Sequence, residues 1–120
     1  MSMFNYNGRV FRSVSNSPNG EVGAETIFRY RQDSHVVWAT YSGGSILFGT
    51  LLASADGQGV LDMRYQHLNQ RGEFMTGQCH STPTILADGR YRMSEIWQWT
   101  SGDRSSGESV VEEIHDAGGV

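Results

Sequence analysis

A single acidic residue stands among aromatic residues in the segment RYRMSEIWQWTSGD, residues 90–103. Glu95 precedes Trp97 by two positions and Trp99 by four. On a β-strand, side chains two positions apart share a face, so the carboxylate and both indoles would point the same way. A carboxylate buried against indoles has a raised pKa, because burial disfavours the charged form. A general acid or base that works near neutral pH needs such a pKa.

Three roles are open for Glu95. It can accept hydrogen bonds from Tyr65, from indole N–H groups or from an inward arginine such as Arg12, and so order a core. It can instead bind a ligand in a cavity, since aromatic walls with a few polar groups are typical of small-molecule pockets. It is also the only candidate for acid–base catalysis. The predicted ligand-binding residues are Glu95, Trp97, Trp99, Tyr65, Met63, Tyr41 and Trp38.

Other kinds of chemistry find little support in the residue types. The chain contains nine arginines and no lysine. Both a Schiff-base lysine and the P-loop motif G-x-x-x-x-G-K-[ST], which needs a lysine, are therefore excluded. Cys79 is the only cysteine, so an intrachain disulfide and a thiolate metal cage are excluded. His67 and His80 flank a QRG turn at 70–72, which would place them near opposite ends of one hairpin. We therefore expect no metal and no cofactor.

The elements that position these residues are predicted to be strands. Short runs of β-branched and aromatic residues alternate with Gly, Asn, Asp and Ser, and Gly-Gly and Asp-Gly pairs are strong hairpin signals. We expect eight strands, at 8–15, 24–32, 35–42, 45–54, 60–69, 73–81, 90–100 and 105–114. A C-terminal helix competes with the eighth strand, because Val110 and Ile114 are four residues apart.

Short connections between all of these strands predict an antiparallel up-and-down meander. Closing the meander into a barrel removes its two exposed edges. A barrel of eight strands is filled by side chains or holds one small ligand. The predicted fold class is therefore all-β, a single eight-stranded antiparallel meander barrel. It is expected to form one domain over residues 1–120, with about the last five residues frayed.

Alternation assigns the faces of the strands. The inward sets are expected to be Tyr91, Met93, Glu95, Trp97 and Trp99 in the seventh strand, Leu61, Met63, Tyr65 and His67 in the fifth, and Thr26, Phe28 and Tyr30 in the second. The turns predict that Gly49 lies near Tyr65, Trp97 near Glu108, Glu95 near Val110 and His67 opposite Phe74. The segment SILFGTLLAS, residues 45–54, is apolar on both faces, which favours a homodimer or a higher homo-oligomer.

Net charge and hydropathy limit which partners the protein is expected to bind and where in the cell it is expected to lie. The net charge is −4, so there is no electrostatic case for binding nucleic acid or an acidic membrane surface. The chain shows no signal-peptide pattern at its start and no run of about 18 apolar residues. We expect a cytoplasmic location.

Three stretches carry a resemblance to a known family: YSGGSILFGTL (41–51), LDMRYQHLNQRGEFMTGQC (61–79) and EIWQWTSGD (95–103). They resemble small bacterial proteins that are often labelled n-acetylglutamate synthase and whose domain is described as avidin-like. The similarity also covers NYNGRVFRSVSNSPNGEV at 5–22 and VVEEI at 110–114. It implies an avidin-like or calycin-like barrel.

The synthase label does not agree with the residues. Acetyltransferases of that class need a glycine-rich pyrophosphate loop that opens a helix, whereas SADGQG at 54–59 begins with serine and leads into a predicted strand. No biotin-contacting residue maps onto the chain, so biotin is not predicted either. We expect a small soluble barrel that binds a small apolar or aromatic ligand. The alternatives are an isomerase, cyclase or lyase that uses Glu95 with Tyr65, and a structural or interaction protein with a filled barrel.

Overall fold

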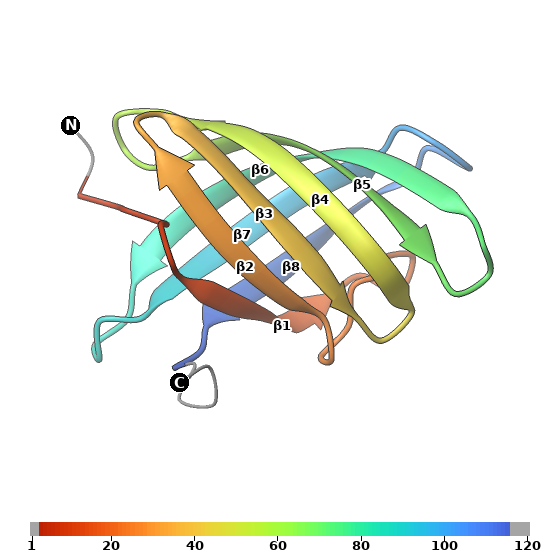
Figure 1. Ribbon diagram of the computed structural model, residues 1–120, viewed down its shortest axis with the longest axis horizontal. Helices are drawn as coiled ribbons and strands as arrows, with labels where there is room; N and C mark the ends of the chain where they lie inside the picture. The colour runs from red at the N-terminus through yellow and green to blue at the C-terminus, as the bar shows by residue number, and fades with distance from the viewer. Residues whose placement is uncertain (1–2, 116–120) are drawn as a thin grey trace.

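Eight antiparallel strands close into a barrel in the computed structural model, which describes residues 3–115 (Figure 1). The strands are β1 (Val10–Asn16), β2 (Ile27–Asp33), β3 (Val36–Gly43), β4 (Ile46–Ala55), β5 (Leu61–Asn69), β6 (Phe74–Ile85), β7 (Tyr91–Trp99) and β8 (Ser106–Glu113). Each strand pairs with its neighbours in sequence, and β8 pairs with β1 to close the ring. The predicted fold class is confirmed. Within the described residues, no helix is long and apolar enough to cross a membrane.

All strand ends lie within three residues of the predicted positions except the end of β6. β6 continues to Ile85 instead of ending near residue 81, and it contains Pro83. Beyond Ser81 the strand pairs only with β7, so the missing N–H of the proline interrupts no ladder with β5. The helical alternative at the C-terminal end is wrong, because residues 106–113 form β8 and bury Ser109 and Val111 on its inner face.

Strand pairing is shifted from the expected register at three hairpins. Gly49 lies opposite His67 instead of Tyr65, and His67 also lies opposite Met75 instead of Phe74. Trp97 and Glu95 lie opposite Gly107 and Ser109, one residue away from the expected Glu108 and Val110. In the β4–β5 turn the cause is local: the Asp56 carboxylate accepts hydrogen bonds from the amides of Gln58 and Val60, which moves the centre of the turn along the chain.

The inward faces predicted by alternation are confirmed in all three strands. Met63 and His67 of β5, Phe28 and Tyr30 of β2, and Trp97 of β7 are buried. The expected shared face of Glu95, Trp97 and Trp99 is also observed, since all three line the same interior space. The side chains of β7 therefore form one wall of the barrel interior.

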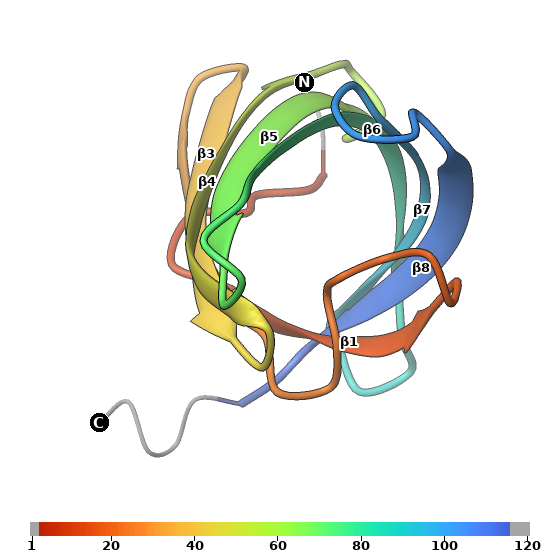
Figure 2. The ribbon, with the colours of Figure 1, turned by 90° about the vertical axis from the view of Figure 1, so that its right-hand side faces the viewer.

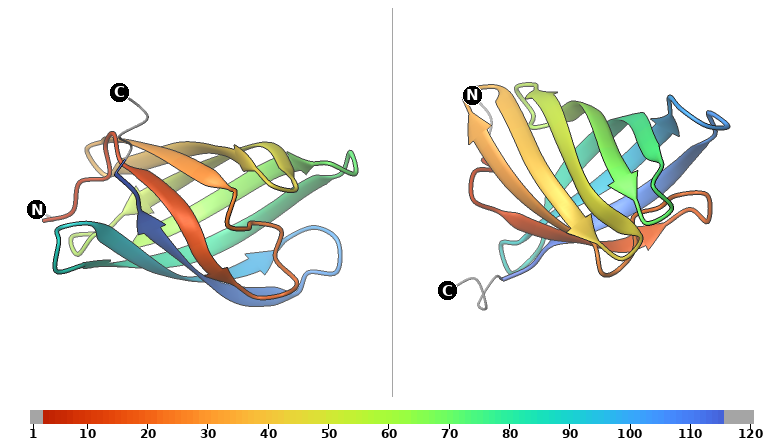
Figure 3. Two further views of the ribbon diagram at one scale, coloured as in Figure 1. Left: turned by 90° about the horizontal axis from the view of Figure 1, so that it is seen from below. Right: turned by 45° about the vertical axis from the view of Figure 1, so that its right-hand side comes forward.

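The chain segment before β1 lies at one end of the barrel, as Figure 3 shows from two sides. Tyr6 is fully buried, and its hydroxyl donates to the carbonyl oxygen of Gly59 at 2.6 Å. The Asn5 amide donates to the Tyr91 hydroxyl at 3.0 Å, and the Arg9 guanidinium lies 3.7 Å from the centre of the Tyr91 ring. This end of the barrel is closed by packed side chains.

The opposite end carries the β1–β2 loop (residues 17–26) together with the β3–β4, β5–β6 and β7–β8 turns (Figure 2). We call this end the mouth. The β3–β4 turn needs glycine at its start, because Gly43 has φ of 118° and a Cβ there would collide with the backbone of Glu25. The turn thereby packs closely against the β1–β2 loop.

The outer face of β3 and β4 is apolar and exposed. Trp38, Phe48 and Leu52 are 40%, 55% and 60% exposed. Trp38 and Leu52 are paired across the two strands, so they form part of one surface. The homo-oligomer expected from the apolar fourth strand stays a prediction.

Candidate ligand-binding cavity

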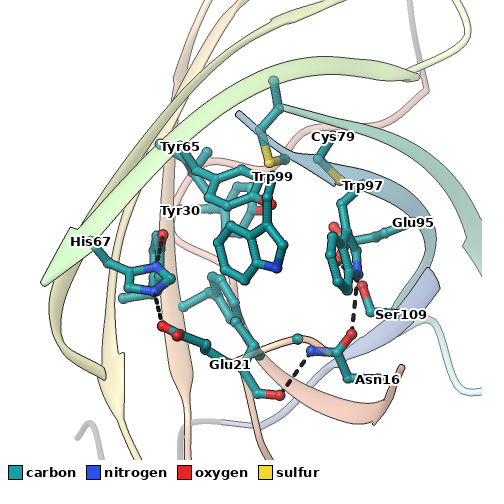
Figure 4. Close-up of a pocket in the computed structure, with 16 residues that line it drawn as sticks. Asn16, Glu21, Tyr30, Tyr65, His67, Cys79, Glu95, Trp97, Trp99 and Ser109 are labelled. Carbon is teal, nitrogen blue, oxygen red and sulfur yellow. Dashed lines mark hydrogen bonds and ion pairs between the residues drawn. The ribbon is translucent and has the colours of Figure 1, made fainter. Parts of the chain in front are cut away.

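An interior cavity lies between the mouth and the packed end of the barrel, with a volume of about 50 Å³ (Figure 4). Six aromatic rings line it: Phe28, Tyr30, Tyr41, Tyr65, Trp97 and Trp99. A space of this size holds roughly three to five water molecules, if each needs about 10–15 Å³ of this kind of volume. The remaining wall combines apolar side chains with a small number of polar ones.

Glycines make room for these rings. The ring of Tyr65 lies over Gly77 on the adjacent strand, and the indole of Trp97 lies over Gly107. A Cβ at either glycine would collide with the ring. Trp97 also meets Trp99 edge to face, with ring centroids 5.4 Å apart. The interior therefore accommodates large rings because the facing positions have no side chain.

Two serines hold the Glu95 carboxylate inside the barrel. The Ser81 hydroxyl donates to Oε2 at 2.6 Å, and the Ser109 hydroxyl donates to Oε1 at 3.0 Å. Both serines are buried. Burial raises the pKa of Glu95 above its ordinary value, and the two serine hydrogen bonds oppose that effect without cancelling it. The cavity wall thus carries a carboxyl group that burial makes harder to ionise than an exposed one.

The partners of Glu95 differ from those expected from sequence. Neither Tyr65 nor the indoles bond to it: the indole N–H of Trp97 donates to the Asn16 side chain, and that of Trp99 donates to the Asn19 carbonyl. Arg12 is exposed on the outside of β1 and does not reach the interior. Serines on the two neighbouring strands supply the donors, and they were not distinguishable from other serines in the sequence.

Two tyrosine hydroxyls face the cavity without a hydrogen-bond partner among the described residues. Tyr30 is only 2% exposed, and Tyr65 is partly buried, yet no bond from either hydroxyl is present within residues 3–115. In the same part of the chain, every fully buried side-chain nitrogen or oxygen has a partner, so both hydroxyls must open onto free space. Burial is the main cause that raises the pKa of both phenols, which keeps them protonated.

The β1–β2 loop covers the mouth of the cavity through Glu21. One oxygen of the Glu21 carboxylate lies 2.8 Å from Nε2 of His67, and the other accepts hydrogen bonds from Asn69 at 3.2 Å and from Arg71 at 2.9 Å. Nδ1 of His67 lies 2.9 Å from the Tyr41 hydroxyl. We call this group of contacts the Glu21 latch, and Figure 4 shows its inner part.

Six of the seven residues predicted to bind a ligand line the cavity: Glu95, Trp97, Trp99, Tyr65, Met63 and Tyr41. The placement of Trp38 is wrong. Val37, Ala39 and Tyr41 are the buried residues of β3, so alternation turns Trp38 to the outer surface.

Several lining residues were missed, for different reasons. Tyr30 and His67 were on predicted inward faces but were not chosen, because nothing in the sequence shows which inward residues lie near the mouth. Glu21 comes from a loop, and its approach to β5 depends on the way the loop folds back. Within residues 3–115, no group of three or more His, Cys, Asp and Glu side chains is placed to hold a metal ion.

A closed antiparallel meander of eight strands, with an aromatic cavity at one end, is the architecture of ligand-binding β-barrels. The model of the family described as avidin-like protein matches residues 4–114, and the chain belongs to that family. No curated protein and no solved structure matches the chain. The avidin-like barrel supports the binding of a small molecule as the general class of function.

Proposed function

We propose that this protein binds a small molecule with an apolar or aromatic body inside the barrel, close to the mouth. The observation that carries the proposal is the pair of unpartnered hydroxyls, Tyr30 and Tyr65, which open onto a cavity beside Glu95. Buried polar groups in proteins are normally hydrogen-bonded, and these two hydroxyls have no partner within residues 3–115, so water or a ligand must supply one. A ligand that enters from the mouth would provide their partners.

The ligand enters past the β1–β2 loop. The cavity of about 50 Å³ is smaller than the roughly 300–1,000 Å³ usual for small-molecule pockets. Gly20, Glu21 and Val22 of the loop form part of the cavity wall, so moving them outward enlarges the space. The other end is closed by Tyr6 and its neighbours, which leaves the mouth as the route.

The loop is attached in a way that allows this movement. Within the described chain, residues 18–25 make backbone-to-backbone hydrogen bonds only to other residues of the loop. Their bonds to the barrel involve side chains, including Ser45 to the Glu21 carbonyl at 2.9 Å and Asn16 to the Val22 carbonyl at 3.0 Å. Side-chain contacts of this kind open at lower free-energy cost than a strand ladder.

Tryptophan fluorescence tests the proposal once Trp38 is removed from the signal. In a Trp38→Phe background the remaining indoles, Trp97 and Trp99, both line the cavity. Titration with a library of small aromatic compounds should give a saturable change for some members. Glu95→Gln should weaken that response, whereas Glu108→Gln, an exposed carboxylate on β8, should leave it unchanged. If no compound gives a saturable change in a folded protein, the filled-barrel alternative is favoured.

An enzyme on the same barrel is a second candidate, because the raised pKa of Glu95 suits an acid–base group. An isomerase, cyclase or lyase reaction would use Glu95 with the hydroxyl of Tyr65. This candidate predicts turnover of a bound compound that Glu95→Gln abolishes while binding persists. Binding without turnover in the wild-type protein favours the first candidate.

A further inference from the structure

We propose that the cavity selects organic cations that carry N–H donors, such as amidinium or primary ammonium groups, with the cationic group seated on Glu95. This inference rests on the proposed function and names the chemical class of the ligand. Three features of the cavity wall support it: the charged groups, the aromatic rings, and the hydroxyls of Tyr30 and Tyr65, which have no partner within residues 3–115.

The Glu95 carboxyl group has no positively charged partner within residues 3–115. Its two hydrogen bonds come from serine hydroxyls, and no described arginine lines the cavity. His67 is the basic side chain of the wall, and both of its ring nitrogens are engaged, by Glu21 and by Tyr41. Burial makes the ionised form of Glu95 costly, and a cationic ligand would stabilise that form by supplying the opposite charge.

The carboxylate also has room for further donors. A carboxylate offers about four lone-pair sites, and one bond from Ser81 and one from Ser109 leave a site free on each oxygen. Charge-assisted hydrogen bonds to such oxygens are roughly twice as strong as neutral ones. An N–H donor on a cation therefore gains more here than the same donor on a neutral group.

The walls favour a cation over an anion. The faces of tryptophan and tyrosine rings attract cations, and Trp97, Trp99, Tyr30 and Tyr65 all line the space. Burial is the main cause that raises the pKa of both phenols; the charge of Glu95 adds to it next for Tyr30, and after that of Cys79 for Tyr65. An anionic ligand would meet Glu95 inside and Glu21 at the mouth.

The open hydroxyls fit the same ligand. Each phenol oxygen of Tyr30 and Tyr65 can accept an N–H bond, so a cation with several N–H groups can contact Glu95 and a phenol together. A neutral amide can make similar contacts, but it supplies no positive charge to stabilise the ionised form of Glu95. The comparison between a cation and its neutral analogue of the same shape therefore isolates the charge.

Isothermal titration calorimetry of the full chain with three matched probes provides the test. Benzamidine is the cation, benzamide the neutral analogue and benzoate the anion. We expect benzamidine to bind at least about tenfold more tightly than benzamide, and benzoate to bind most weakly. Glu95→Gln should bring the ratio of benzamidine to benzamide close to one, while Glu108→Gln should preserve it.

The ranking of the probes on the wild-type protein decides the proposal even if Glu95→Gln does not fold. Tyr30→Phe is a second variant that breaks no hydrogen bond within the described chain, and it should weaken benzamidine severalfold. Benzamide or benzoate binding as tightly as benzamidine would overturn cation selectivity. A preference that survives Glu95→Gln would also overturn it, because the charge would then lie elsewhere.

The two experiments together distinguish failure of the cation proposal from failure of the proposed function. If none of the three probes binds, the cation proposal is overturned, while a saturable response to a neutral aromatic compound in the fluorescence titration still supports the proposed function. If neither experiment finds a ligand for the folded protein, both proposals fail together.

Discussion

Glu95 is held inside the barrel by two hydroxyls and faces aromatic rings, so its ionised form is destabilised by removal from water. A group whose pKa is raised in the folded state stabilises the fold below its unfolded pKa. That stabilisation is lost as the pH rises through the folded pKa. For Glu95 the window therefore begins near the ordinary glutamate value of about 4.3 and extends upward.

Glu95→Gln should remove this pH dependence. Relative to wild type, the variant should become progressively more stable as the pH rises from about 4 to 7. Urea unfolding of both proteins at several pH values measures the difference. Titratable neighbours such as Tyr6, Tyr65 and Cys79 are present in both proteins, so their contributions cancel. A difference that stays constant over this pH range would contradict the burial of the charge.

At the scale of elements, the barrel interior depends on rings that lie over glycines of adjacent strands. Gly77→Ala would place a Cβ against the ring of Tyr65. We expect a loss of about 1–3 kcal/mol of unfolding free energy, as overpacked cores show. Gly57→Ala in the β4–β5 turn is the control, because a Cβ there meets nothing within 4 Å. Equal effects of the two substitutions on urea unfolding would argue against the packing of Tyr65.

The β1–β2 loop is the second element with a measurable role. Glu21→Gln keeps the shape of the side chain but removes its charge from the latch with His67, Asn69 and Arg71. Hydrogen bonds to charged groups are worth about 1.5–3 kcal/mol, so exchange of the Gly20 and Gly23 amides, which donate hydrogen bonds within the loop, should accelerate about tenfold or more.

Hydrogen-exchange mass spectrometry of the loop measures this, with Glu25→Gln as the control in the same loop. Glu25 is exposed and takes no part in the latch. If both variants exchange like wild type, the Glu21 latch does not hold the loop closed.

The sequence predicted those features that depend on local alternation. The shared inward face of Glu95, Trp97 and Trp99 follows from their spacing of two, and so does the inward position of Tyr65. The same rule could have turned Trp38 outward, had Val37 and Tyr41 been assigned inward first. The position of Glu21 and the serine partners of Glu95 depend on contacts between distant segments. Register also escaped prediction, because it depends on turn details such as the capping of the β4–β5 turn by Asp56.

At the scale of the whole molecule, the barrel is asymmetric. Packed side chains led by Tyr6 close one end, and a loop held mainly by side chains covers the other. The chain belongs to the avidin-like family over residues 4–114, and the cavity lies at the loop-covered end. One end closed by packed side chains and the other covered by a loop that can open is the arrangement expected of a barrel that admits a ligand from one side only.

The central claim, that a ligand occupies this cavity, is tested most directly by nitrogen–proton NMR of the three indole N–H groups. Trp97 and Trp99 report on the cavity, and Trp38 on the outer surface is an internal control. Addition of benzamidine, or of a ligand found by fluorescence, should shift the Trp97 and Trp99 signals saturably and leave the Trp38 signal in place. If only the Trp38 signal shifts, or if neither compound shifts the Trp97 and Trp99 signals, the claim that a ligand occupies the cavity is contradicted.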